Sequence, residues 1–98
     1  MSVYVRDIWF SPEFLEEYQN LPKRVRKQVD AKTRLISESA VLPPSFQAHR
    51  VEGSDLWIGY VNQGPNGYRI LFSFNGDGTI TFEKVCGHNE MDEYLREA

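Results

Sequence analysis

Three side chains in the second half of the sequence could hold a phosphate or move a proton: Arg69, His88 and Tyr94. Arginine is always charged and can bind two phosphate oxygens at once. Histidine, with an ordinary pKa of about 6.5, can act as acid or base at neutral pH. Whether these groups meet depends on the elements that carry them.

The residue pattern begins with a strand and two helices. VYVRDIWF at 3–10 is β-branched and aromatic, as strands are. Ser11 and Pro12 are typical of a helix start, as N-cap and first helical residue. Pro22 separates this helix from a second one at 23–39, which is expected to bury Val25, Val29 and Ile36. The short connection predicts an antiparallel hairpin.

The rest of the sequence predicts sheet punctuated by turns. Glycines in the hairpin at 76–78 supply positive φ, and a short helix is expected around Tyr94. The predicted strands are 46–51, which is weak, then 56–62, 68–75 and 79–86. We therefore expect one domain, residues 1–98, of the α+β class, with the helices on one face of an antiparallel sheet of three or four strands behind the first strand.

Strand alternation separates the two faces of the sheet. In the strand at 68–75, the aromatic and aliphatic residues at even positions face the helices, and Arg69 points to the other face, which we expect to be uncovered. His49 and Arg50 are neighbours in a strand, so at most one of them can join Arg69.

Charge is unevenly distributed along a chain of net charge −3. The segment 22–34 contains six basic residues and one acidic residue. Such a helix face can contact RNA phosphates, bind an acidic partner or simply be solvated. The candidate phosphate-binding residues on it are Lys23, Arg26, Lys27 and Arg34.

Cysteine and histidine counts argue against several other classes of site. Cys86 is the only cysteine and there are two histidines, so we expect no disulfide, no metal and no cofactor. The sequence has no apolar run long enough for a membrane span or signal peptide, and a single unpaired thiol suits the cytoplasm.

Four phrases, in order, resemble the RelE/ParE superfamily of toxins from type II toxin–antitoxin modules. They are FSPEFLEEYQNLPKRVRKQV, HRVEG, YRILF and VCGHNEMDEY, and they span nearly the whole chain. In the RelE-like branch, which we favour, the resemblance implies a small antiparallel sheet behind a helical hairpin. The concave face of that sheet would receive messenger RNA in the ribosomal A site.

The resemblance also implies a metal-independent ribonuclease, in which the ribose 2′-hydroxyl is deprotonated and attacks the adjacent phosphate, and the 5′-oxygen leaves. It assigns Arg69 to the scissile phosphate, His88 to proton transfer, and Tyr94 to base stacking or assistance in the reaction. His49 and Arg50 lie where other members have polar residues. The resemblance makes His49 a further catalytic candidate and Arg50 an RNA-binding one.

The implied partners are a cognate antitoxin, the ribosome and messenger RNA, with a toxin–antitoxin heterotetramer as one assembly to consider. Two departures from the family pattern keep other functions open. The strand LWIGYVN lacks an arginine that many members carry, and the chain is acidic where ribosome-directed toxins are usually basic. The alternatives are a ParE-like inhibitor of DNA gyrase and a non-catalytic protein that only binds its antitoxin.

Overall fold

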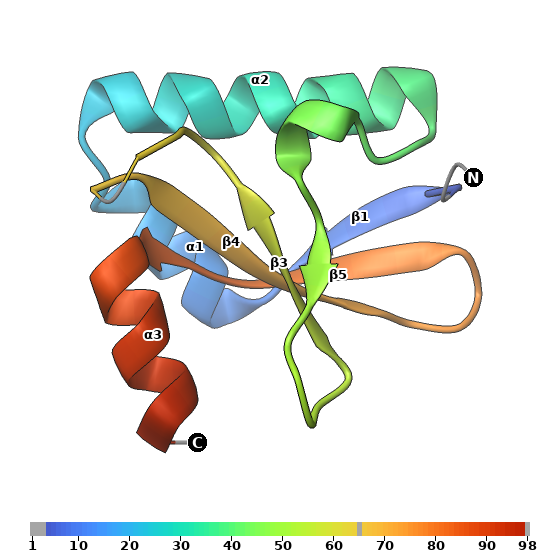
Figure 1. The fold of residues 1–98 in the computed structure, drawn as a ribbon. Coiled ribbons are helices and arrows are strands. Elements are labelled where there is room, and N and C mark those ends of the chain that lie inside the picture. Colours follow the sequence, from blue (N-terminus) through green and yellow to red (C-terminus); the bar gives the residue numbers. More distant parts are fainter. Residues whose placement is uncertain (1–3, 65, 98) are drawn as a thin grey trace.

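The computed structural model describes residues 4–64 and 66–97, and it confirms the α+β prediction (Figure 1). No helix in this part of the chain is long and apolar enough to span a membrane. The elements, in chain order, are β1 (Asp7–Phe10), α1 (Pro12–Gln19), α2 (Lys23–Ser39), the 3₁₀ turn η1 (Pro44–Phe46), β2 (His49–Arg50), β3 (Leu56–Tyr60), β4 (Tyr68–Phe74), β5 (Thr79–Gly87) and α3 (His88–Glu97).

The five strands form one sheet in the order β1-β5-β4-β3-β2. β1 runs parallel to β5, and every other neighbouring pair is antiparallel. β1 is shorter than the strand predicted at 3–10, whose first residue lies outside the described residues. It begins at Asp7 because Tyr4 instead forms an isolated bridge with Val41, beyond the end of α2.

The weak strand predicted at 46–51 is mostly absent. Pro44 to Phe46 form a 3₁₀ turn, and only His49 and Arg50 pair with β3. Proline fits the first position of such a turn and cannot donate to a sheet. Phe46 is completely buried, so packing of its ring holds this segment against the core rather than in the sheet.

α1 lies along the edge of β5 beyond the point where β1 ends. The Ser11 hydroxyl caps α1 by accepting from the Phe14 N–H (3.0 Å), and it also donates to the Glu83 carbonyl of β5 (2.9 Å). Further along, the Glu17 carboxylate accepts from the Val85 N–H (3.0 Å). Side chains of α1 thus satisfy backbone groups that would otherwise be an open sheet edge.

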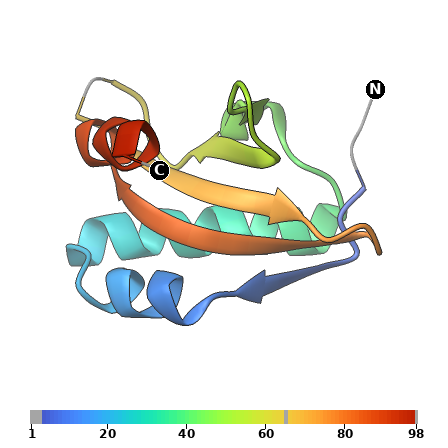
Figure 2. The same ribbon diagram turned by 90° about the horizontal axis from the view of Figure 1, so that it is seen from below.

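α1 and α2 cover one face of the sheet, and α3 lies against the other (Figure 2). The three residues predicted to face inward from α2, Val25, Val29 and Ile36, are all buried. They meet a core dominated by aromatic and aliphatic side chains of the sheet, of α1 and of η1: Phe14, Phe46, Ile70, Phe72, Ile80, Phe82 and Val85.

The second face of the sheet is not uncovered, contrary to the sequence prediction. Met91 and Leu95 of α3 pack onto Leu71, Cys86 and Ile58 and form a smaller second core. α3 is amphipathic, and burial of its apolar side stabilises it against this face. Only the part of the face beside the start of α3 is left for a site.

Gly59 in β3 is a point of very close approach, and Gly59→Ala is expected to destabilise the fold. An added Cβ would lie 2.0 Å from the Phe46 ring, which is itself in the core. Overpacking of this kind typically costs about 1–3 kcal/mol and sometimes more. Urea unfolding measures it, with Gly87→Ala as the matched control, since a Cβ there would meet only a Glu90 oxygen at 3.8 Å. Equal stability of the two variants would contradict this packing.

Candidate active site

A cavity of about 60 Å³ lies between strands β2–β4 and the first turn of α3. Its lining brings together three of the residues singled out from the sequence: His49, Arg69 and His88. The other lining residues are Ile58, Tyr60, Met91 and Asp92. Residues from four different elements therefore converge on one hollow.

Strand register explains why His49 joins Arg69. His49 pairs with Ile58, and Tyr60 pairs with Arg69, so these side chains all project from the same face of the sheet. Arg50 pairs with Trp57 on the opposite face, and its Nε donates to the Ser54 carbonyl (2.8 Å). The prediction that at most one of the two neighbours joins Arg69 is confirmed.

Arg69 is buried, with 5% of its surface exposed. The sequence prediction that it lies on an open surface is wrong. Its Nη1 donates to the carbonyls of Asn62 (2.9 Å) and Tyr68 (3.1 Å), and its Nη2 donates to Gly64 (3.2 Å). The Tyr60 ring lies against it, with the guanidinium carbon 3.8 Å from the ring centroid. Carbonyls of the β3–β4 loop and of the first residue of β4 thus occupy three of the five N–H donors of arginine.

His88 is the first residue of α3, and an acid one turn further on faces its ring. His88 Nε2 lies 3.4 Å from Asp92 Oδ2, and both residues line the cavity. The backbone N–H of His88 donates to the Gly67 carbonyl (2.8 Å), which ties the start of α3 to the β3–β4 loop. The sequence prediction did not include Asp92, although its spacing of four residues from His88 on a helix is a signal that could have identified it.

His49 carries a contact that favours one tautomer. Its Nδ1 lies 3.1 Å from the Gln47 carbonyl oxygen. A carbonyl oxygen can only accept, so the contact favours a proton on Nδ1 and leaves Nε2 of the neutral ring as an acceptor. The His49 ring also packs edge-on against Tyr60, with centroids 6.1 Å apart. Tyr60 thus contacts both His49 and Arg69.

Comparison with known proteins places this arrangement in a known fold. No family model and no curated protein sequence matches the chain. Solved structures do match. A chain of the RelB–RelE antitoxin–toxin complex from Methanococcus jannaschii is 22% identical with a TM-score of 0.70, and the match covers 89% of this chain and 98% of that one.

Two further structures agree. A chain of the archaeal RelE–RelB complex from Pyrococcus horikoshii OT3 is 22% identical over 87% of this chain and 94% of that one, with a TM-score of 0.61. An arginine-substituted mutant of E. coli toxin RelE in the free state is 25% identical over 100% of this chain and 95% of that one, with a TM-score of 0.63. The chain has the fold of the RelE toxins. The resemblance to the RelE/ParE superfamily drawn from four sequence phrases is thereby confirmed at the level of the fold.

Tyr94 of this RelE-like fold does not line the cavity. Its ring lies on the other flank of α3, 4.9 Å from Lys84 Nζ, and Lys84 forms ion pairs with Glu13 and Glu17 of α1. Burial by itself lowers the pKa of Lys84, but the Glu17 carboxylate outweighs it and the net shift is upward. Tyr94 therefore contacts a charged network between α3, β5 and α1 and not the groups around Arg69.

The basic residues of α2 also lie apart from the cavity. α2 packs on the opposite face of the RelE-like sheet (Figure 2). Lys23, Lys27 and Arg34 are exposed there, and Arg26 is half-buried. None of these side chains lines the cavity of Arg69. The phosphate binding predicted for them therefore concerns a surface separate from the cavity.

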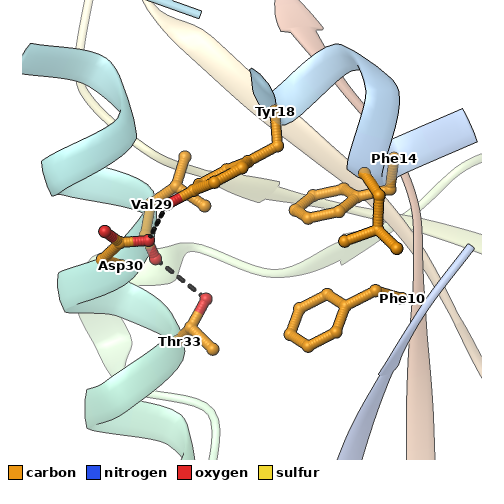
Figure 3. Close-up of a pocket in the computed structure, with 7 residues that line it drawn as sticks. Phe10, Phe14, Tyr18, Val29, Asp30 and Thr33 are labelled. Atoms are coloured by element: carbon orange, nitrogen blue, oxygen red, sulfur yellow. Dashed lines mark hydrogen bonds between the residues drawn. The ribbon is translucent and has the colours of Figure 1, made fainter. Parts of the chain in front are cut away.

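A larger cavity, of about 200 Å³, lies on the helical side between β1, α1 and α2 (Figure 3). Its lining is mainly apolar and comprises Phe10, Phe14, Leu15, Tyr18, Val29, Asp30 and Thr33. The Tyr18 hydroxyl reaches from α1 to the Asp30 carboxylate of α2, and this hydrogen bond is the main cause of a raised Tyr18 pKa. The chemistry of this lining suits an apolar contact and not catalysis.

Cys86 lies beneath α3, and its thiol is expected to react slowly in the folded protein. Burial raises the pKa of Cys86 to about 11 from 9.0, although the Lys84 charge opposes the shift. At pH 8 the thiolate fraction is then about 10²-fold below that of an ordinary cysteine, at a factor of ten per pKa unit. Disulfide exchange with a chromogenic reagent, with and without denaturant, measures this. Equal rates in the two conditions would contradict it.

Within residues 4–64 and 66–97, no three His, Cys, Asp or Glu side chains are grouped so as to hold a metal ion.

Proposed function

We propose that this protein is the toxin of a type II toxin–antitoxin module and that it cleaves messenger RNA on the ribosome. The observation that carries the proposal is one cavity of a RelE-like sheet lined by His49, Arg69 and His88. Transesterification of RNA requires a base, an acid and a cation that stabilises charge developing on the phosphorane. Two imidazoles and a guanidinium can supply all three.

The contacts suggest which group does what. His49 Nε2, unprotonated when Nδ1 donates to Gln47, takes the proton of the ribose 2′-hydroxyl. The oxygen attacks the adjacent phosphorus, and Arg69 stabilises the charge on the phosphorane oxygens. His88, whose Nε2 lies 3.4 Å from Asp92, acts in its protonated form and gives a proton to the departing 5′-oxygen. The products are a 2′,3′-cyclic phosphate and a 5′-hydroxyl end.

An antitoxin partner belongs to the same proposal. Among the structures of this fold are RelB–RelE antitoxin–toxin complexes. In this protein, we propose that an antitoxin segment lies across the helical hairpin or the sheet, as an amphipathic helix or an added strand. The exposed side chains Phe10 and Leu15, which line the cavity of Figure 3, offer apolar contacts. A toxin–antitoxin heterotetramer in the cytoplasm is the assembly that we propose.

Two observations favour a second candidate, a ParE-like inhibitor of DNA gyrase or a toxin-fold protein without chemistry. Three donors of Arg69 are already bonded to backbone carbonyls, and the chain carries a net charge of −3. Arg69 can therefore have the structural role of holding the β3–β4 loop without binding a nucleic-acid phosphate, and an acidic protein attracts nucleic acid less. The two candidates make different predictions about nucleic acid.

A cell-free assay separates the candidates. Purified protein is added to a bacterial translation reaction, and the message is mapped by primer extension. A parallel reaction measures DNA supercoiling by gyrase. We expect translation to stop, with cuts in the message that appear only when ribosomes are present. Loss of supercoiling with an intact message would favour the gyrase inhibitor, and no effect in either reaction would favour a non-catalytic protein.

A further inference from the structure

Asn62, in the loop after β3, uses both its backbone carbonyl and its side chain to hold Arg69 in place. Its carbonyl accepts from Arg69 Nη1 (2.9 Å), and its Oδ1 accepts from the N–H of Tyr68, the residue next to Arg69 (2.7 Å). Its Nδ2 donates to Oε1 of Gln28 on α2 (2.7 Å). One asparagine therefore connects the helical side of the sheet to the arginine that lines the cavity on the other side.

Gly67 closes the loop around the guanidinium. A Cβ at this position would lie 2.6 Å from Arg69 Nη1 and 2.6 Å from the Asn62 carbonyl oxygen, so only glycine fits without a shift. The Gly67 carbonyl also accepts from the backbone N–H of His88 (2.8 Å). The same loop thus fixes Arg69 and the first residue of α3, which carries the second candidate group of the cavity.

We propose that Asn62 is a positioning residue for Arg69, supported from α2 by Gln28. The inference rests on the proposed function in that Arg69 is taken to bind the scissile phosphate. Arginine has five N–H donors, and the backbone carbonyls of Asn62, Gly64 and Tyr68 engage three of them. The Nε–H and one Nη2–H have no partner among residues 4–64 and 66–97, and these are the donors that a phosphate can engage.

These contacts preorganise the Arg69 guanidinium for binding of the phosphate. The side chain is buried, and the Tyr60 ring confines it on one side. Three hydrogen bonds to carbonyls prevent rotation about the terminal bonds of the side chain. A donor that is already oriented does not have to reorganise as charge develops in the transition state. Asn62→Ala retains the backbone carbonyl that Arg69 contacts but removes the side chain that holds this carbonyl's loop to Tyr68 and Gln28, so the guanidinium keeps its charge and its direction becomes less fixed.

Three variants test the proposal. Asn62→Ala removes the side chain that connects Tyr68 and Gln28. Gln28→Leu keeps a similar volume but removes the acceptor for Asn62 Nδ2, and Gln28→Glu restores an acceptor and is the matched control. The first measurement is the NMR signal of the Arg69 guanidinium in protein without RNA. The second is single-turnover cleavage of message on programmed ribosomes, with ribosome binding measured separately.

The wild-type protein is expected to give a slowly rotating Arg69 guanidinium that is protected from exchange. Asn62→Ala and Gln28→Leu should both speed its rotation, and Gln28→Glu should not. Misplacement of such a group lowers a catalysed rate by about 10²-fold, so Asn62→Ala should slow cleavage by about that factor with ribosome binding unchanged. Gln28→Leu should give a smaller loss in the same direction.

A folded Asn62→Ala variant with an unchanged Arg69 signal and unchanged cleavage would overturn the proposal. If Asn62→Ala does not fold, the comparison of Gln28→Leu with Gln28→Glu decides by the same criteria. Failure of the proposed function is recognised separately. In that case the wild-type protein does not cleave, while the NMR comparison still reports whether Asn62 and Gln28 orient Arg69.

Discussion

Arg69→Ala is expected to lower the single-turnover rate of message cleavage by about 10²–10³-fold, the usual loss when one preorganised charged donor is removed. Growth inhibition on expression should disappear with it. Arg69 is the only arginine or lysine that lines the cavity of His49 and His88 within the described residues, so no neighbour can replace its charge.

The alanine variant also changes the fold locally, and the experiment must separate the two effects. Removal of the guanidinium leaves the Asn62 carbonyl without a donor among the described residues, whereas the Gly64 and Tyr68 carbonyls still accept from the N–H groups of Gly67 and Val61. A buried acceptor left unsatisfied costs about 1–3 kcal/mol. Arg69→Lys is therefore the control, because it keeps a charge and three donors in the same place but loses the planar fork. It should retain more stability than alanine and still cleave slowly. An Arg69→Ala protein that is folded and fully toxic at equal expression would remove Arg69 from the site.

His88→Gln is expected to slow cleavage by about 10²–10⁴-fold, the range for loss of a general acid or base. In the wild type, His88 Nε2 lies 3.4 Å from Asp92 Oδ2. Glutamine keeps an N–H that can donate to Asp92, so this contact is retained while proton transfer is lost. Binding to ribosomes should change little, because the lost interaction belongs to the transition state.

The matched control for His88 is its exposed neighbour, Asn89→Ala, which should cleave at the wild-type rate. Single-turnover cleavage and ribosome binding are measured for both variants. If His88→Gln weakens binding as much as it slows cleavage, or changes neither, His88 is a residue that only begins α3. The ParE-like or non-catalytic candidates would then describe the protein better.

Local patterns in the sequence were sufficient to predict several features of this structure. Helical spacing identified Val25, Val29 and Ile36 as the buried side of α2, and the N-cap at Ser11 placed the start of α1. Alternation along the strands was enough to predict that Arg69 faces away from the helices, because a strand has only two sides. These features depend on neighbours in sequence and so are readable from it.

Other features depend on contacts between distant segments. The burial of Arg69 is due to backbone carbonyls at 62–68, which every residue type possesses and which leave no signature in the sequence. The docking of α3 through Met91 and Leu95 closed a face that the sequence suggested was open. It also directed Tyr94 toward Lys84 and away from the cavity. The acid beside His88 followed only once α3 was known to begin at that residue.

Single-turnover cleavage of a message whose A-site codon carries one 2′-deoxynucleotide tests the central claim most directly. If the groups around Arg69 catalyse attack by the 2′-hydroxyl, the all-ribose message is cut on the ribosome and yields a 2′,3′-cyclic phosphate end. The message with the 2′-deoxy substitution at the nucleotide before the cut should stay intact at that position. Cleavage of both messages at the same rate, or of neither, would contradict the account.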